Sequence, residues 1–271
     1  LYDILNELHE RRDEFDEIII EATGVADPTG LAQPFIIHPL VKKHFPLTAI
    51  ICLVDAELVE DQLKETEEAI NQIAYSDVLL INKIDLVSEN YVSVLEGRLR
   101  QLNPLARIVK GHKTQFPKIE YRSRDNDKLD VLLQAQKEVE VKGDQLSFPV
   151  HKPHAHHQHK HTEEVNSHTF TFDSPFDLQL LHHHLFVYLS FQSKDLYRMK
   201  GLVWLENKDE QYIIQSVGKR LSFQEKRAWK PLEPKQSAIV FIGKQLQRQG
   251  LEKLLKRCIS ATYRQKHSNA I

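Results

Sequence analysis

The 271-residue sequence has few of the residues that mark special classes of protein. Its two cysteines, Cys52 and Cys258, are too few and too far apart for a disulfide framework or a Cys-x-x-Cys site, so we interpret both as core thiols. The longest apolar runs, such as 50–54, fall far short of the roughly 18 residues that a spanning helix needs. No secretory signal opens the chain. These absences predict a cytoplasmic protein without a membrane partner.

The sequence also lacks an excess of either charge. Its 36 lysines and arginines nearly balance 38 aspartates and glutamates, giving a net charge of -2, and no segment is strongly basic. Nucleic acids and anionic membrane surfaces are bound by clustered positive charge, so neither is an expected partner. The composition, 41% hydrophobic and 27% charged, is typical of a soluble globular protein with one large domain or two ordinary ones.

Short apolar runs alternate with helical patterns in the first half of the chain. A helical stripe of leucines and isoleucine begins at the first residue, so we expect the chain to start inside a domain. We then expect strands at 17–20, 48–54, 78–81 and 107–109, and helices at 29–37, 56–74 and 88–102. Near-continuous apolar strands separated by helices predict an α/β fold with a mostly parallel sheet covered on both faces.

Polar residues stand where the predicted strands end. Ligands of such sheets bind at the carboxyl ends of the strands, where Glu21, Asp55 and Asn82 all fall. Asn82, Lys83 and Asp85 form an Asn-Lys-x-Asp pattern that suits guanine, because a carboxylate accepts from both N1 and N2 of that base. The lysine stem covers the ring. The alternative is a strand-to-loop turn with incidental polar residues.

The segment EATGVADP, which begins at Glu21, has two interpretations. In a nucleotide-binding sheet, Glu21 is placed to hold a magnesium ion, usually through water, and Gly24 lets the backbone approach a terminal phosphate. In the simpler interpretation, Glu21 and Asp27 end a strand and cap the helix that follows Pro28.

Several segments together resemble the CobW family of P-loop GTPases, specifically its metallochaperone-like members. They are EATGVADP, CLVDA, QIAYSDVLLINKIDL, LNPLARI, RMKGLVWLE and SAIVFIGKQL, and they cover the chain from residue 1 to about 258. The resemblance implies an incomplete P-loop GTPase domain followed by a smaller α+β domain. It implies that GTP and Mg²⁺ are bound and that a metal, most often zinc, is delivered to a client protein.

Two features of that family are absent from the sequence. Neither the phosphate loop Gly-x-x-x-x-Gly-Lys-Ser/Thr nor a Cys-x-Cys-Cys metal motif occurs. Both belong upstream of Leu1 in the family, so the resemblance implies an N-terminally truncated GTPase. The fragment is expected to hydrolyse little or no GTP.

Seven histidines from His151 to His168 crowd a segment with almost no apolar residues, which predicts a linker. Neutral imidazoles bind zinc, nickel, copper and cobalt, so the tract is a candidate metal site, although a solvated spacer remains the alternative. The consecutive His182, His183 and His184 cannot share one helix face, so we interpret them as structural. The candidate metal ligands are His151, His154, His156, His157, His159 and His161.

The second half predicts a smaller domain. Strands at 199–205, 211–217 and 238–242 lie close in sequence, which favours an antiparallel sheet with helices on one face. We expect a GTPase domain at 1–145, a linker at 146–167, a C-terminal domain at 168–260 and a tail at 261–271. Two functions stay open: a GTP-dependent metal chaperone, and a non-catalytic metal buffer that uses the histidines. A homodimer is also left open, and the sequence does not name the client.

Overall fold

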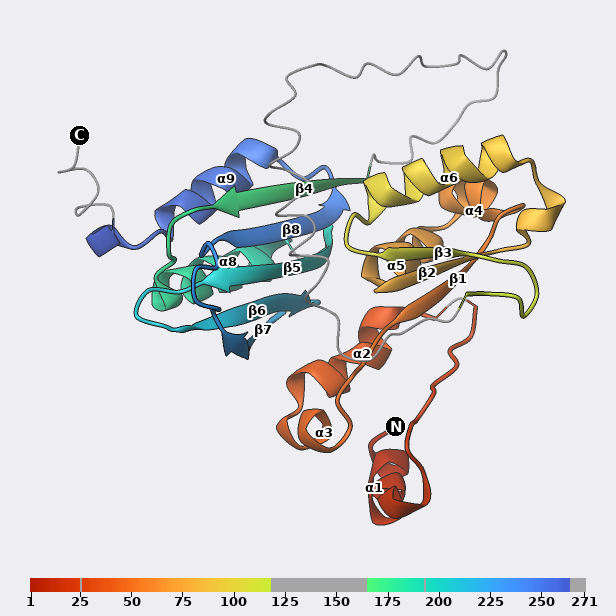
Figure 1. Ribbon diagram of the computed structural model, residues 1–271, viewed down its shortest axis with the longest axis horizontal. Helices are drawn as coiled ribbons and strands as arrows, with labels where there is room; N and C mark the ends of the chain where they lie inside the picture. The colour runs from red at the N-terminus through yellow and green to blue at the C-terminus, as the bar shows by residue number, and fades with distance from the viewer. Residues whose placement is uncertain (25, 118–164, 193, 264–271) are drawn as a thin grey trace.

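The computed structural model describes residues 1–24, 26–117, 165–192 and 194–263, which form two sheets with their own helices (Figure 1). The elements of the first part are α1 (Tyr2–Glu10), η1 (Arg12–Glu14), α2 (Pro28–Ile37), α3 (Pro39–His44), β1 (Ile51–Asp55), α4 (Val59–Glu65), α5 (Glu67–Tyr75), β2 (Val78–Asn82), η2 (Ile84–Leu86), α6 (Glu89–Leu102) and β3 (Arg107–Lys110). Those of the second are β4 (Val165–Phe172), α8 (Leu178–Gln192), β5 (Leu196–Trp204), β6 (Glu210–Val217), β7 (Arg220–Ala228), β8 (Ser237–Lys244) and α9 (Arg248–Arg257).

The N-terminal sheet is parallel, with strand order β1-β2-β3. This confirms the predicted fold class for the first part. Its core consists of apolar side chains from the strands and from α4, α5 and α6, including the fully buried Leu79, Ile81, Leu95 and Leu99. Because the strands are parallel, their carboxyl ends meet at one edge of the sheet.

The strand predicted at 17–20 is wrong in this structure, because the segment is irregular and exposed. Ile19 is 83% and Ile20 46% exposed. A strand needs a neighbour that completes its hydrogen-bond ladder, and no strand in the described ranges pairs with this segment or with the outer edge of β1. The apolar pattern indicated burial, but pairing decides whether such a segment becomes a strand.

The single helix predicted at 56–74 is two helices, α4 and α5, separated at Thr66. The Thr66 backbone is extended, its hydroxyl donates to the carbonyl of Gln62, and its oxygen accepts from the backbone N–H of Ala69. Thr66 is therefore the N-cap of α5, a role that threonine fills well. Asp27 caps α2 in the same way, accepting from the Thr29 N–H ahead of Pro28.

The C-terminal sheet is antiparallel, with strand order β4-β8-β5-β6-β7. Helices α8 and α9 cover one face and pack on a core that includes Phe176, Met199 and Phe241, which confirms the predicted α+β arrangement. The edge strand β7 was not predicted, because its sequence RLSFQEKRA is charged and only partly buried. The structure also begins β5 and β6 earlier in the chain than predicted.

The other face of the C-terminal sheet packs against the N-terminal part of the chain. Val240 and Ile242 of β8 and Leu202 of β5 form a cluster with Ala74 and Leu105, while the alternate residues of β8 face α8 and α9. Both faces are therefore covered. This explains why β5 and β8 are buried along nearly their whole length, although antiparallel sheets commonly leave one face to solvent.

A charged junction joins the two parts beside that apolar cluster. The Asp77 carboxylate, before β2, forms an ion pair with the Arg198 guanidinium and lies 3.5 Å from the Lys200 Nζ, both on β5. Arg198 and Lys200 are almost fully buried. Burial alone would raise the pKa of Asp77, but the two cations and hydrogen bonds from Arg198 and the Ile50 N–H hold that pKa well below its usual range.

The last backbone carbonyls of α5 accept hydrogen bonds from side chains at this junction. Asn103 Nδ2 donates to the carbonyls of Ile73, Ala74 and Ser76, and Arg198 donates to those of Tyr75 and Ser76. A helix leaves its final carbonyls without partners of its own. Here a loop of the first part and a strand of the second supply them.

Candidate functional site

The candidate nucleotide site lies at the carboxyl edge of the parallel sheet, where Asp55 of β1 stands opposite Asn82 of β2. Lys83 follows in the left-handed region, with φ of 59°, and its Nζ lies 2.6 Å from Asp55 Oδ2. Asp55 Oδ1 also accepts from the Glu57 N–H. Burial acts to raise the pKa of Asp55, but the bonds from Lys83 and Glu57 outweigh it, so the pKa is lowered. The side-chain hydrogen bond to Asp55 raises the pKa of Lys83. Asp55 and Lys83 therefore stay ionised and paired at neutral pH.

Two polar groups of the Asn-Lys-x-Asp segment have no partner in the described part of the chain. Asn82 Oδ1 is buried and makes no hydrogen bond there. Leaving such a group unsatisfied costs about 1–3 kcal/mol, so it indicates a missing partner. Asp85 lies in η2 with an exposed side chain, and no hydrogen bond or ion pair to it is found among the same residues. Lys83, held to Asp55, lies between them in the chain.

Glu21 and Gly24 lie in the irregular segment before α2 and are exposed. Gln72 of α5 holds this segment, because its Nε2 donates to the carbonyls of Gly24, at 2.9 Å, and Ala26, at 3.2 Å. A methyl group at Gly24 would meet no atom within 4 Å. No hydrogen bond or ion pair joins Glu21 or Gly24 to the Asn82–Asp85 segment within the described ranges. Sequence reasoning missed Gln72, since a glutamine within a helix carries no signal of its loop contact.

The six candidate metal ligands from His151 to His161 lie outside the described residues, and their role stays a prediction. His168 is different, because it lies in β4 and its Nε2 is 3.0 Å from the carbonyl oxygen of Leu246. Counting His168 with the histidine tract was therefore wrong. No group of three or more histidine, cysteine, aspartate or glutamate side chains suited to a metal ion occurs among the residues that the structure describes.

Both cysteines are free thiols within the fold. Cys258 is fully buried, and Cys52 lies half-buried in β1. Burial raises the pKa of the Cys52 thiol to about 11, so it is protonated at neutral pH and a poor metal ligand. Their interpretation as packing residues agrees with this environment.

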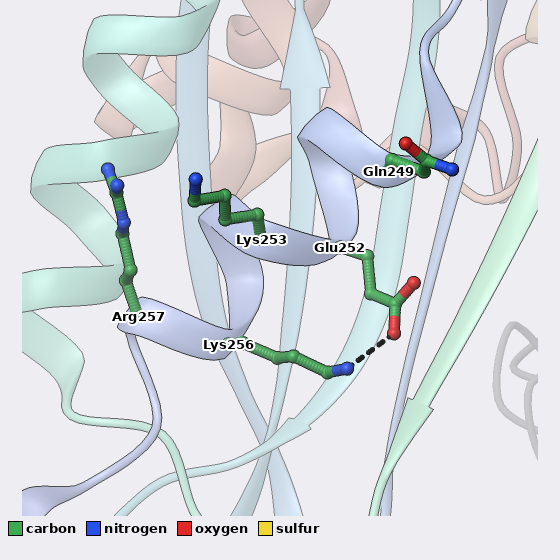
Figure 2. A pocket seen from close by; sticks show the side chains of 5 residues that line it. All are labelled: Gln249, Glu252, Lys253, Lys256 and Arg257. Carbon is green, nitrogen blue, oxygen red and sulfur yellow. Dashed lines mark ion pairs between the residues drawn. The ribbon is translucent and has the colours of Figure 1, made fainter.

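Two hollows of the described surface lie away from the carboxyl edge of the parallel sheet. One, of about 470 Å³, is lined only by residues of α9 and its end, and Figure 2 shows their side chains spread along one helix. Its Glu252 and Lys256 form an ion pair at 2.6 Å. The other, of about 250 Å³, lies beside Trp204 and Tyr263 in the C-terminal part. Neither contains the groups singled out from the sequence.

No helix in the described ranges is long and apolar enough to cross a membrane. This agrees with the lack of long apolar runs in the sequence.

Comparison with known proteins gives two family matches, one for each part of the chain. Residues 1–110 match the CobW/HypB/UreG nucleotide-binding domain, and residues 165–259 match the C-terminal domain of the cobalamin synthesis protein cobW. The two matches follow the same order as the two sheets. The proposed domain boundaries differ from both ranges and stay predictions.

Similar proteins include zinc chaperones and a zinc-regulated GTPase. The zinc chaperone YjiA of Escherichia coli is 28% identical over 91% of this chain and 72% of its own length. The zinc-regulated GTPase metalloprotein activator 1 of Schizosaccharomyces pombe is 27% identical over 79% of this chain, which spans only 56% of that protein. The zinc chaperone CobW of Pseudomonas aeruginosa is 24% identical over 96% of this chain and 71% of its own length.

The crystal structure of Zn(II)-bound YjiA GTPase from E. coli has the same fold. The TM-score is 0.68 at 24% identity, over 96% of this chain and 76% of that one. Fold, domain order and family matches agree with one another. The chain therefore belongs to the CobW family, with a CobW/HypB/UreG nucleotide-binding domain followed by a CobW C-terminal domain.

Proposed function

We propose that this chain is part of a cytoplasmic GTP-binding and GTP-hydrolysing metal chaperone that delivers zinc to a client protein. The observation that carries the proposal is the Asn82–Asp85 segment at the carboxyl edge of the parallel sheet. Asn82 Oδ1 is buried there without a partner among the described residues, and Asp85 is exposed. The zinc chaperones and zinc-regulated GTPase among its relatives support the choice of metal.

The proposed base recognition uses three side chains of this segment. Asp85 accepts from N1 and N2 of guanine, Asn82 supports the loop and the other edge of the base, and the Lys83 stem covers the ring. The ion pair with Asp55 restricts the position of Lys83 before the nucleotide arrives. Adenine offers no matching donors to Asp85.

Preference for GTP over ATP is the direct test. Because the sequence contains no phosphate-loop pattern, the assay uses a longer protein in which such a loop precedes residue 1. We expect ATP to bind roughly 10- to 100-fold more weakly than GTP, because adenine would cover the Asp85 carboxylate without pairing with it, and an unpaired polar group that becomes buried costs about 1–3 kcal/mol. Competition against a fluorescent GDP analogue measures both affinities. Equal affinities would contradict the guanine assignment.

Glu21 is the proposed carboxylate for magnesium and water. Its side chain is exposed and shows no hydrogen bond or ion pair to the described residues, so it fits a role that requires an available oxygen ligand. A bound magnesium ion would neutralise developing phosphate charge, and Glu21 would position its water ligands. Gly24, with open space around its Cα, is the proposed point where the backbone approaches the terminal phosphate.

Replacing Glu21 by alanine in the longer protein should lower GTP turnover much more than GTP affinity. The loss falls on magnesium and water positioning, while base recognition is intact. We expect at least a roughly tenfold loss of kcat, measured by phosphate release beside equilibrium binding. Glu17→Ala, four residues earlier, is the matched control. It should lower kcat by less than Glu21→Ala does and leave GTP affinity close to that of the parent. Equal turnover of Glu21→Ala and the parent would assign Glu21 a role outside catalysis.

A non-catalytic metal buffer is the second candidate function, and the histidine tract favours it. Zinc uptake by the 271-residue chain tests the tract without any phosphate loop. We expect zinc to bind at about pH 7.5 and leave near pH 5.5, because imidazoles with an ordinary pKa of about 6.5 lose their free lone pairs on protonation. Affinity should be modest, since fixing the backbone and side chains of several ligands around an ion costs conformational entropy.

Calorimetry separates the tract from binding elsewhere. The comparison protein carries asparagine in place of His154, His156, His157, His159 and His161. A control protein carries asparagine at His182 and His183 of α8, where both side chains are exposed. Zinc uptake should fall only in the first. Equal zinc uptake by the parent, the tract variant and the α8 control would mean that the tract is only a spacer. The metal-buffer function would then have no support.

A further inference from the structure

Helix α8 of the C-terminal domain carries a second apolar face that no other element covers in the part of the chain that the structure describes. Its inner face buries Leu181, Leu185 and Leu189 completely against the sheet. On the outside, Phe191 is 82% exposed and Val187 38% exposed. A surface helix of a globular domain usually has polar residues opposite its buried stripe. Because α8 has apolar residues there, its outer face is suited to a second contact.

The outer residues repeat at the spacing of a helix-packing seam. Leu180, His184, Val187 and Phe191 stand at i, i+4, i+7 and i+11, the alternating three- and four-residue spacing of positions that pack against another helix. We call these four residues the α8 seam. Leu180 is 42% exposed. Phe186, 53% exposed, lies about a third of a turn away from the seam, on the side where His182 contacts Phe223 of β7. The seam extends along most of the 15-residue helix.

We propose that the α8 seam is a homodimer contact, in which α8 of one copy packs antiparallel against α8 of a second copy. The helix contains no lysine, arginine, aspartate or glutamate, so two copies meet without like-charge repulsion at neutral pH. In a two-fold symmetric dimer the same patch of each copy forms the contact. The seam suits this arrangement, because its residue spacing of four, three and four is the same in both directions along the helix.

The antiparallel direction follows from the order of residues in the seam. Running the second helix in reverse places Leu180 opposite Phe191 and His184 opposite Val187, so each pair joins a larger side chain to a smaller one. A parallel pair would place the two His184 rings together and the two Phe191 rings together. Two facing imidazoles in an apolar seam lack good partners, and that disfavours the parallel arrangement.

The exposed area sets the strength of this contact. A phenylalanine offers about 150–250 Å², so the exposed fractions of Phe191, Leu180 and Val187 amount to roughly 300 Å² of apolar surface. That lies within the range of the largest apolar patch of a typical monomer, about 300–600 Å². Two copies would bury roughly 600 Å² of apolar surface together with their polar flanks, which is small beside the total of about 1,200–2,000 Å² in standard stable interfaces. We therefore expect a weak dimer, with a Kd on the order of 10–100 µM.

Sedimentation velocity of the 271-residue chain from about 2 to 200 µM tests the proposal, because this range brackets the expected Kd. The parent should shift from monomer to dimer with concentration. Val187→Lys and Phe191→Lys should each weaken association at least about tenfold, since a charge must then be buried in the seam. Val94→Lys is the matched control, because Val94 is an exposed valine on a different helix, α6, and this protein should associate like the parent.

Three results would overturn the contact. They are a parent that stays monomeric at the highest concentration, a dimer that persists unchanged in Val187→Lys, or equal weakening by Val94→Lys. Circular dichroism and thermal unfolding establish that each variant is folded, so loss of the dimer is not loss of the domain.

Disulfide trapping tests the direction of the helices. A mixture of His184→Cys and Val187→Cys proteins should form mixed 184–187 disulfides faster than either protein links to itself, if the helices are antiparallel. Faster 184–184 linkage would overturn the antiparallel arrangement. The parent provides the background, which should be low because Cys258 is buried and the Cys52 thiol is protonated.

Discussion

Asp77→Ala is expected to lower the free energy of unfolding by about 3–5 kcal/mol, because it removes the Asp77 carboxylate from a largely buried ion pair with Arg198 and from its place 3.5 Å from Lys200 Nζ. It also removes the acceptor of the Ile50 N–H. Arg198→Ala should cost a similar amount, since it removes the donor to the carbonyls of Tyr75 and Ser76 as well. Urea denaturation followed by circular dichroism measures both values.

Surface ion pairs provide the matched controls. Asp61 pairs with Lys64 at 3.3 Å and is 71% exposed, and Arg100 pairs with Glu96 at 2.7 Å and is 54% exposed. Asp61→Ala and Arg100→Ala should each cost less than about 1 kcal/mol. If Asp77→Ala cost no more than Asp61→Ala, the junction would not be a stabilising element.

The Asp77 junction also predicts how stability depends on pH. Its pKa is depressed in the folded state, so the unfolded chain takes up a proton first as the pH falls. The stabilisation is fully present above the unfolded pKa, about 3.9, and is lost as the pH falls from there through the folded value. The difference in unfolding free energy between the parent and Asp77→Asn should therefore be constant from pH 7 to 5 and shrink below about pH 4. A constant difference down to pH 3 would contradict the ionised pair.

Asp85→Asn is expected to change the base preference of the longer, phosphate-loop-containing protein from guanine to xanthine. The variant should bind GTP at least about tenfold more weakly, because the amide presents a donor to a base edge that itself donates. It should gain affinity for xanthosine triphosphate, whose C2 oxygen accepts from that amide. Titration of GTP and xanthosine triphosphate into the parent and into Asp85→Asn gives four affinities, and their comparison measures the change in base preference.

Asp209→Asn is the control for this experiment, since Asp209 is 97% exposed and lies between β5 and β6 of the other domain. It should leave both affinities unchanged. An unchanged GTP affinity in Asp85→Asn would remove the guanine assignment. A loss of GTP affinity without a gain for xanthosine triphosphate would show that Asp85 supports the loop but does not read the base.

The parallel sheet was predictable because each strand is a short apolar run that ends in a polar residue. The apolar runs that end at Asp55 and Asn82 mark two strands of the sheet, the half-exposed edge strand β1 and the largely buried β2, and both end in the polar residues at the carboxyl edge. Local capping was predictable for the same reason, as Asp27 shows ahead of Pro28. In each case the determining interaction lies within a few residues of the sequence that predicts it.

The rest depends on contacts between residues far apart in the chain. The segment 17–20 has a strand composition, but its state is decided by whether another strand lies beside it. The Lys83–Asp55 pair joins two strand ends, and Gln72 reaches a loop that precedes it by more than forty residues. Asp77 looks like an ordinary turn residue until the fold places Arg198 against it. Such side chains have no period or motif, so sequence patterns do not reveal them.

The way α5 ends has a consequence for how the chain folds. Its last carbonyls are satisfied partly by Arg198, a residue 123 positions after Tyr75 in sequence, and the apolar face around Ala74 is covered by the second sheet. Without that sheet, the first domain would leave these carbonyls and this face exposed. We therefore expect the two domains to unfold in one cooperative transition, with coincident fluorescence and circular dichroism curves. During synthesis, the first domain would reach its final stability only after β5 has emerged from the ribosome.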